Sequence, residues 1–89
     1  MTLQQLRYIV AIDRSRSFAG AAAELGVTQP TLSALLVKLE GELGVRIFER
    51  SNRSVRPTAI GERILAQAEK ILGDVDRITE TVVEQRQGL

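Results

Sequence analysis

This chain of 89 residues has no cysteine and no histidine. The first absence excludes disulfides and thiolate metal sites, and the second removes the usual acid–base group near neutral pH. No apolar run approaches the roughly 18 residues that a membrane helix needs. Residues 1–5 also lack the basic start of a signal peptide. We therefore expect a soluble, cytoplasmic protein with no metal and no cofactor.

An enzyme is not expected either, because the groups that catalysis requires are missing from the sequence. It contains no nucleophile–base pair, no cluster of residues at metal-ligand spacing and no glycine-rich phosphate loop. Most of the carboxylates fall in the last third of the chain, at positions that a helix would expose to solvent. The remaining candidates are therefore binding and structural functions.

Charge is nearly balanced overall, with a formal net charge of +1, but it is unevenly distributed. Residues 1–45 carry four basic and four acidic side chains, and residues 57–89 carry four basic and six acidic ones. Between them, residues 46–56 hold four arginines against one glutamate, a net charge of +3. Such a segment favours one anionic partner docking at one place. A solvated arginine-rich hairpin is the alternative.

The segment from Ala21 to Ser33, AAAELGVTQPTLS, predicts a helix-turn-helix. Gly26 suits the left-handed C-cap of a short helix, and Thr28 suits the N-cap of the next one. Pro30 falls in the first turn of that second helix, where a missing N–H costs nothing. In this motif the second helix enters the DNA major groove, so the segment indicates DNA binding.

The helix that follows Thr28 is expected to have one buried and one exposed face. Its leucines are spaced four, three and four residues apart, as a buried stripe requires, at Leu32, Leu36, Leu39 and Leu43. Gly44 ends the helix. The polar and small residues fall on a different face, at Gln29, Ser33, Ala34 and Lys38.

Residues 46–56 indicate a small β-hairpin, the wing of a winged helix. Turn-forming residues at 51–54 separate two short stretches, and Pro57 ends the hairpin. Arg50 and Arg53 flank its tip, where an arginine can enter a narrow minor groove or hold a phosphate. We expect Arg53 in the groove and Arg50 on a phosphate.

A long last helix is predicted from its cap at Thr58 to about Gln87. Its apolar residues are separated by four, three, four, three and four positions: Ile64, Ala68, Ile71, Val75, Ile78 and Val82. A period of about 3.5 residues is typical of a seam between two helices. A rod of about 45 Å exceeds what residues 1–57 can cover, so a second copy is the expected partner. Folding back onto its own domain is the alternative.

These features resemble the N-terminal domain of LysR-type transcriptional regulators. The matching positions keep their spacing without gaps from about residue 3 to the end: Phe18, Ala21, Ala22, Leu25, Gln29, Pro30, Leu32, Ser33, Leu39, Glu40, Leu43, Gly44, Phe48, Glu49, Arg50, Arg53, Thr58 and Gly61. Segments 29–33 and 50–55 look most like the peroxide-sensing regulators of the family. Two positions depart from the pattern: Ala34, where many members carry arginine or glutamine, and Ile60, where alanine is usual.

The resemblance implies a mainly α fold with two parts. Residues 1–57 would form a winged helix-turn-helix, and residues 58–89 a linker helix that pairs antiparallel with its copy. It further implies a homodimer, assembly to a tetramer in full-length members, and a ligand-sensing domain absent from this chain. A dimeric regulator associated with the nucleoid and bound to an inverted repeat is the expected function.

The predicted DNA contacts follow from the chemistry of each residue. Gln29 can bond an adenine edge through both amide atoms, and Pro30 and Thr31 offer apolar surface to a thymine methyl. The helix start presents backbone N–H groups to a phosphate, although Thr28 and Ser33 also suit purely local roles. The candidate DNA-binding residues are Thr28, Gln29, Pro30, Thr31, Ser33, Lys38, Arg50 and Arg53. A protein-interaction module and a coiled-coil adaptor are the competing functions.

Overall fold

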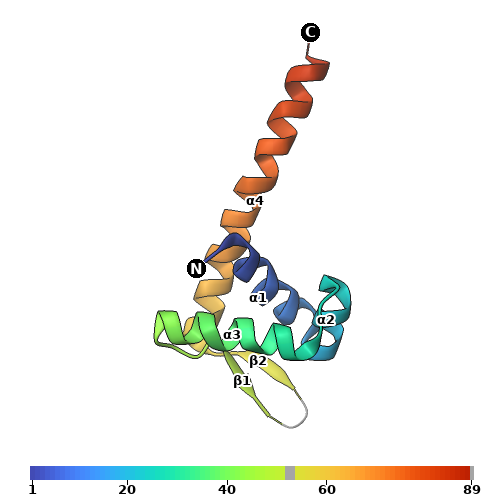
Figure 1. Cartoon of the computed structure of the whole chain (residues 1–89). Helices are drawn as coiled ribbons and strands as arrows, with labels where there is room; N and C mark the ends of the chain where they lie inside the picture. The colour runs from blue at the N-terminus through green and yellow to red at the C-terminus, as the bar shows by residue number, and fades with distance from the viewer. Residues whose placement is uncertain (52–53, 89) are drawn as a thin grey trace.

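The computed structural model describes residues 1–51 and 54–88, and it contains four helices and one hairpin over those residues (Figure 1). In chain order these are α1 (Leu3–Ser15), α2 (Phe18–Leu25), α3 (Gln29–Leu43), β1 (Phe48–Arg50), β2 (Val55–Pro57) and α4 (Ala59–Gln87). The first three helices and the hairpin form a head, and the second half of α4 projects from it. The predicted winged helix-turn-helix with a long last helix is confirmed.

The turn between α2 and α3 is held by two caps that the sequence predicted. Gly26 lies in the left-handed region, with φ +70°, and the N–H groups of Gly26 and Val27 donate the two bonds of a Schellman motif. Thr28 then caps α3 by accepting a hydrogen bond from the N–H of Thr31 at 3.2 Å. This short connection, capped on both sides, fixes the angle between α2 and α3.

The hydrophobic core is shared by α1, α2, α3, the hairpin and the first half of α4. Its largest fully buried side chains are Phe48, Ile9, Ile12, Leu32, Leu39 and Ile47. The predicted leucine stripe of α3 faces this core, with Leu43 partly buried at its end. The hairpin extends one residue further than expected, because Pro57 is the last residue of β2 and lies opposite Phe48.

The first half of α4 belongs to the head. Leu65, Ala68 and Leu72 are 4%, 1% and 7% exposed, and α4 packs there against α1. The core therefore extends past the expected boundary at residue 57 as far as Leu72. Ala68, expected at the seam between two chains, is instead buried inside its own head, because it lies on the face of α4 that meets α1.

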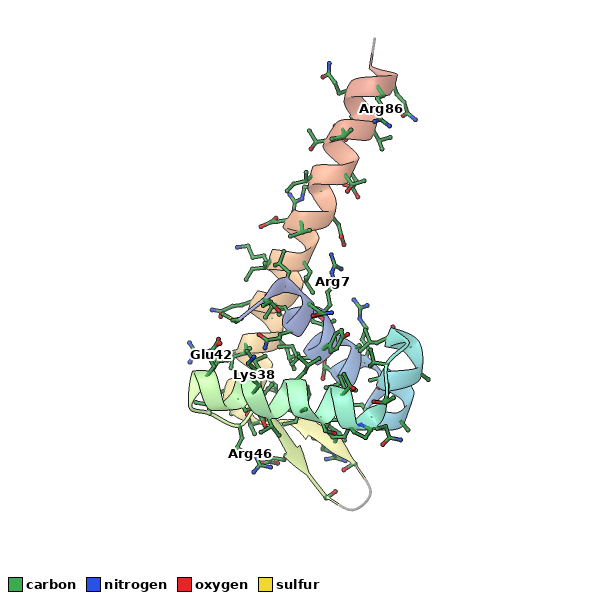
Figure 2. The ribbon with its side chains drawn as sticks, viewed as in Figure 1. Arg7, Lys38, Glu42, Arg46 and Arg86 are labelled. Carbon is green, nitrogen blue, oxygen red and sulfur yellow. The ribbon has the colours of Figure 1, made fainter. Side chains whose placement is uncertain are left out.

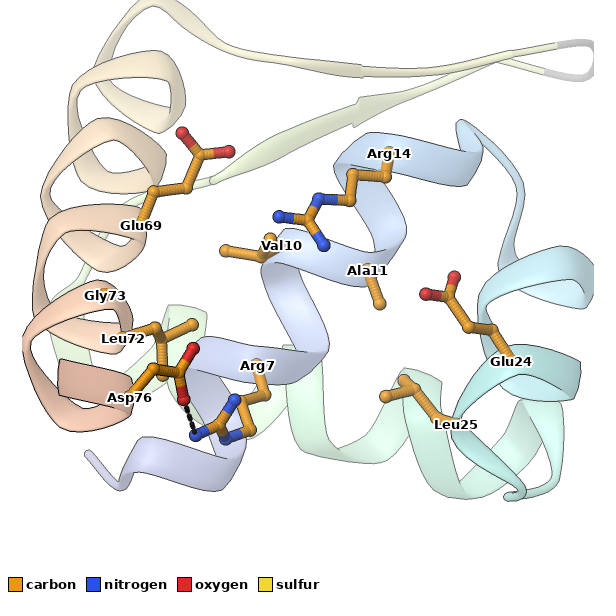
Figure 3. A pocket seen from close by; sticks show the side chains of 10 residues that line it. All are labelled: Arg7, Val10, Ala11, Arg14, Glu24, Leu25, Glu69, Leu72, Gly73 and Asp76. Carbon is orange, nitrogen blue, oxygen red and sulfur yellow. Dashed lines mark hydrogen bonds and ion pairs between the residues drawn. The ribbon is translucent and has the colours of Figure 1, made fainter. Parts of the chain in front are cut away.

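An ion pair marks the point where α4 leaves the head. The Arg7 guanidinium lies 3.4 Å from the Asp76 carboxylate, and both side chains are exposed (Figure 3). Beside it, an open cleft of about 480 Å³ between α1, α2 and α4 carries charges of both signs, including Arg14 and Glu69. Neither sign dominates this cleft, so it does not select a ligand by charge.

Beyond Leu72 the helix is almost entirely exposed. Ile78, Val82 and Val83 are 66%, 46% and 42% exposed, with charged residues between them. Within residues 1–51 and 54–88, none of the helices has an apolar stretch long enough to cross a bilayer. The apolar side chains of this half of α4 therefore lack any cover from their own head.

Candidate nucleic-acid interface

The start of α3 forms the centre of the candidate interface. Gln29, Pro30 and Thr31 are all exposed, and Ser33 is half-buried in the next turn. Lys38 is exposed further along the same helix (Figure 2). The buried leucine stripe fixes the rotation of α3 on the head, so these residues face solvent as the sequence predicted. Their roles in binding stay predictions.

Hydrogen bonds at the N-terminus of α3 limit which of its polar groups can contact DNA. The Thr28 hydroxyl accepts the Thr31 N–H and donates to Thr31 Oγ1 at 2.9 Å. Thr28 is therefore occupied as a cap, while Thr31 is exposed and keeps its own hydroxyl proton to donate. Pro30 has no N–H to offer. Among the described residues of this first turn, only the Gln29 N–H is left for a phosphate.

The hairpin forms the second part of the interface. Its strands pair antiparallel with Glu49 opposite Arg56 and Arg50 opposite Val55. Ser51 and Ser54 close the turn, since the Ser51 N–H donates to the Ser54 carbonyl at 3.1 Å and the Ser54 N–H to Ser51 Oγ at 3.3 Å. This closure ties the two strands together immediately before the tip.

The structure describes only part of the two wing arginines that the sequence predicted to contact DNA. Arg53 lies outside the described residues, and of Arg50 only the backbone, in β1, is described. Two other arginines of the basic segment are exposed: Arg56 lies in β2, and Arg46 lies at the base of the hairpin (Figure 2). The described part of the wing thus keeps its basic character beside Glu49.

A buried carboxylate attaches the wing to α3. Glu40 is 8% exposed, and its Oε2 accepts hydrogen bonds from the N–H groups of Ile47 at 2.7 Å and Phe48 at 3.4 Å. These two amides lie where the chain enters β1. A charged acceptor makes stronger hydrogen bonds than a neutral one. The position of β1 relative to α3 is therefore set by a side chain of α3.

A second attachment fixes the wing to α4. The Thr58 N–H donates to the Ile47 carbonyl at 2.9 Å, its hydroxyl donates to the Arg46 carbonyl at 2.6 Å, and it accepts the Gly61 N–H at 2.9 Å. A Cβ at Gly61 would collide with the Ile47 carbonyl oxygen. Glycine is needed here because α4 approaches the backbone of the wing so closely.

Sequence reasoning assigned no site role to Glu40, Thr58 or Gly61 beyond a cap at Thr58. All three belong to the motif that carried the family resemblance, and the structure explains why they occur together. The signal in the sequence was a glutamate directly beside the buried Leu39. Val37 of α3 was also not singled out, and its side chain is 57% exposed. An apolar residue outside the leucine stripe was the available signal.

The fold, with α3 exposed at its start and the hairpin beside it, defines a winged helix-turn-helix domain with an attached long helix. Residues 3–62 match the family described as bacterial regulatory helix-turn-helix proteins of the lysR family. Since this match spans more than half of the sequence, the chain belongs to the LysR family.

Individual relatives agree with this assignment. The chain is 41% identical over 86 residues to the HTH-type transcriptional regulator YnfL of Escherichia coli, covering 97% of this chain and 29% of YnfL. Full-length OxyR from Pseudomonas aeruginosa is 51% identical with a TM-score of 0.86, over 92% of this chain and 28% of OxyR. The BenM DNA-binding domain in complex with benA site DNA is 37% identical with a TM-score of 0.91 over all of both chains. This chain thus spans less than a third of YnfL and OxyR.

Proposed function

We propose that this chain is the DNA-binding part of a dimeric bacterial transcription regulator that recognises an inverted repeat. One observation carries the proposal: the exposed start of α3 and the wing lie on the same side of the head, opposite the projecting half of α4 (Figure 1). The wing is held there by Glu40 and Thr58. Major-groove and minor-groove elements are thereby kept at a fixed spacing before DNA arrives. The DNA complex of the similar BenM domain supports this assignment.

In the proposed complex α3 reads bases in the major groove. Gln29 bonds an adenine edge through its amide, and Pro30 and the Thr31 methyl group contact thymine methyls. Ser33 meets a base or a phosphate at the edge of the contact. The Gln29 N–H and the Lys38 ammonium hold phosphates, which position the helix without specifying sequence.

The wing is proposed to contact the flank of each half-site. Arg53 would enter the minor groove, where a narrow groove concentrates negative potential, and Arg50 would hold a phosphate. Support comes from the net charge of +3 over residues 46–56 and from the closed turn at Ser51 and Ser54. Arg46 and Arg56 add positive charge along the same hairpin.

Two heads joined through α4 would convert weak binding by each head into useful affinity. A single head offers few base contacts, because the exposed Ala34 of α3 cannot donate a hydrogen bond. We place the longer protein in the cytoplasm, at the nucleoid. We further propose that a ligand-sensing domain follows α4 and that the longer protein assembles to a tetramer. Its relatives are transcriptional regulators, which supports a regulatory rather than an enzymatic role.

The direct test is enrichment of a random duplex library on this chain, followed by fluorescence anisotropy at two salt concentrations. An enriched inverted repeat with a steep salt dependence is expected, because neutralised phosphates release counterions. Absence of both enrichment and salt dependence would show that DNA is the wrong partner and favour a protein-interaction module.

The wing is tested separately by Arg53→Ala on the enriched sites. Loss of a minor-groove arginine should weaken binding most at half-sites with A·T-rich flanks, since these have the narrowest groove. Anisotropy on duplexes that differ only in the flank measures this. Equal weakening on every flank would reduce Arg53 to a phosphate contact, with the major-groove part of the proposal intact.

A further inference from the structure

The exposed face of α4 carries a stripe of apolar side chains that differs from the predicted seam. Ala68 leaves the stripe because it is buried in the head, and Ile60 joins it at 40% exposure. At about 100° per residue, the members all lie within about 40° of the direction of Ile71. They are Ile60, Ile64, Gln67, Ile71, Val75, Ile78 and Val82. Gln67 is the polar member of an otherwise aliphatic set.

This stripe is symmetric about Ile71. Ile60 and Val82 lie eleven residues on either side of it, Ile64 and Ile78 lie seven, and Gln67 and Val75 lie four. A two-fold interface must be complementary to itself, because each position of the patch meets its own mirror position on the partner. A helix stripe with such spacing meets this condition when two copies run antiparallel.

We infer that two copies of this chain pair along α4 with the two-fold axis passing at Ile71. This inference rests on the dimer in the proposed function and adds its register. Ile71 packs against Ile71 of the second copy at the centre, and Ile64 packs against Ile78 on each side. Gln67 faces Val75, and Ile60 faces Val82 at the ends. Running the helices antiparallel also keeps the two heads at opposite ends of the pair.

A groove on the head supplies the second observation. It has a volume of about 290 Å³, lies beside the stripe, and is lined mainly by apolar residues that include Met1, Leu43, Val45, Ile60, Ile64 and Ile71. The stripe thus forms one wall, and the ends of α1 and α3 form the other. Such an apolar hollow needs an aliphatic occupant to exclude water.

In this register, the second copy places two aliphatic side chains at the groove. Ile78 and Val82 of the second copy would lie opposite Ile64 and Ile60, directly over the hollow. These two side chains are 66% and 46% exposed in a single chain, in the half of α4 that lies beyond its own head. One contact therefore covers both the apolar groove and the exposed half of the helix.

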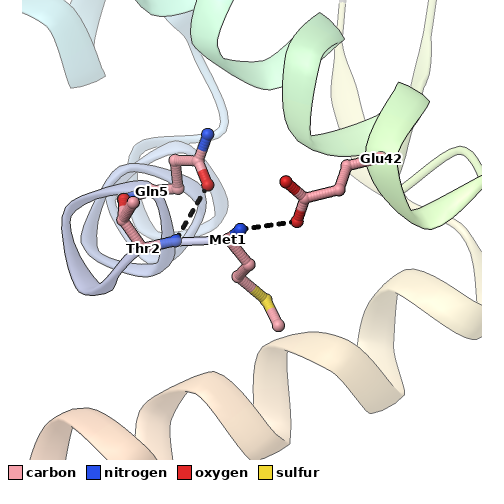
Figure 4. A network of polar contacts seen from close by, with 4 residues as sticks. All are labelled: Met1, Thr2, Gln5 and Glu42. Atoms are coloured by element: carbon pink, nitrogen blue, oxygen red, sulfur yellow. Dashed lines mark hydrogen bonds and ion pairs between the residues drawn. The ribbon is translucent and has the colours of Figure 1, made fainter.

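The rim of the groove is fixed before pairing. The terminal ammonium of Met1 lies 2.6 Å from the Glu42 carboxylate, so α1 is tied to the end of α3 (Figure 4). The Met1 side chain extends from this contact towards α4. A flexible thioether at the rim can adapt to an incoming aliphatic side chain.

A competing register can be separated from this one. The heptad seam that includes Ala68 is also self-complementary, but its two-fold axis passes at Gly73 and sets Ile64 opposite Val82. It places Ala68 opposite Ile78 of the second copy; Ala68 also lines the groove, but its side chain is only 1% exposed and offers little surface to a partner. The two registers differ by four residues at each pairing, about 6 Å along the helix.

Cysteine cross-linking tests the register cleanly, because the chain has no cysteine of its own. Helices packed about 8–10 Å apart, with Cα atoms about 2.3 Å from each axis, bring facing Cα atoms within disulfide reach. Purified Ile71→Cys should therefore form a disulfide dimer under mild oxidation. Ile78→Cys should not, since its two copies lie about 21 Å apart along the helix. Ala66→Cys, exposed on the opposite face, is the control for random collision.

Mixed samples of two single variants sharpen the result. Ile64→Cys mixed with Ile78→Cys should cross-link at least tenfold more than Ile64→Cys mixed with Val82→Cys. The reverse preference would move the axis to Gly73 and overturn the inference, and self-linking of Ile78→Cys would indicate parallel helices and do the same. Light scattering on the unmodified chain separates failure of the dimer from failure of the register alone. If the chain is a monomer, both the dimer of the proposed function and its register are wrong.

Discussion

The two halves of α4 both carry apolar side chains at helical spacing, but these side chains meet different surroundings. In the first half, Leu65 and Leu72 are buried against α1 at 4% and 7% exposure. In the second half, Ile78 and Val82 remain 66% and 46% exposed. The first half of the helix is thus part of the folded head, and the second half exposes apolar side chains that its own head does not cover.

The comparison teaches that one helix can serve two cores because it has two apolar faces. Leu65, Ala68 and Leu72 share the face that meets the head, and the stripe centred on Ile71 lies about a quarter turn away. Near the head both faces are present, and beyond Leu72 the stripe continues while Val83 is the apolar residue left on the other face. Mutations should therefore separate the stability of the head from association of two copies.

The largest effect is expected for Ile71→Asp, which places a charge at the centre of the stripe. Ile71 is 43% exposed in the single chain, so an aspartate there is tolerated by the head. Two facing carboxylates would abolish pairing, and loss of two-headed binding should weaken operator affinity by about 10²–10⁴-fold. Light scattering and anisotropy measure the two results.

The matched control is Ala66→Asp, which makes the same charge change on the opposite, exposed face of α4. It should leave dimers and operator affinity within about threefold of the unmodified chain, as expected for a surface substitution. Dimers that persist in Ile71→Asp would contradict the stripe assignment.

The next effect separates the two faces by stability. In the monomeric Ile71→Asp background, Leu65→Ala should lower the free energy of unfolding by about 2–5 kcal/mol, because it opens a cavity in the core. Ile78→Ala should change it by no more than about 0.5 kcal/mol, since that side chain is already exposed. Urea unfolding followed by circular dichroism measures both. A similar loss for both variants would show that the distal half also packs on its own head.

Glycines provide a smaller version of the same comparison. Gly61→Ala should lower the free energy of unfolding by about 1–3 kcal/mol, because the new Cβ collides with the Ile47 carbonyl where α4 meets the wing. Gly73→Ala meets nothing within 4 Å and should raise it by about 0.5–1 kcal/mol through helix propensity. Thermal unfolding shifts in opposite directions are expected, and a loss in both would argue against the close approach at Gly61.

Local signals in the sequence predicted the elements well. Thr28, Gly26, Gly44 and Thr58 cap the helices as expected, and the end of α4 at Gln87 agrees with the prediction. Each of these features depends on residues within one or two turns of one another. Capping chemistry is short-ranged, so a single sequence is enough to recognise it.

Features that depend on packing between elements could not be predicted in this way. The heptad spacing placed Ala68 at a seam, but a small residue at a seam position also suits close contact with α1. Only the rotation of α4 on the head decides between them. In the same way, periodicity does not show that the Glu40 carboxylate reaches two amides seven and eight residues further along the chain.

The smallest expected effect concerns that carboxylate and distinguishes a buried from an exposed glutamate on α3. Glu40→Gln keeps one carbonyl oxygen for the Ile47 N–H but loses the charge, so the free energy of unfolding should fall by about 1 kcal/mol in urea unfolding. Glu42→Gln, which loses an exposed ion pair with the Met1 ammonium, should change it by less than about 0.5 kcal/mol. The two variants make the same chemical change two positions apart on one helix.

If Glu40 also sets the position of the wing, its variant alone should lose preference between duplexes that differ in the half-site flank, measured by anisotropy. Equal behaviour of the two variants would leave Thr58 as the contact that positions the wing.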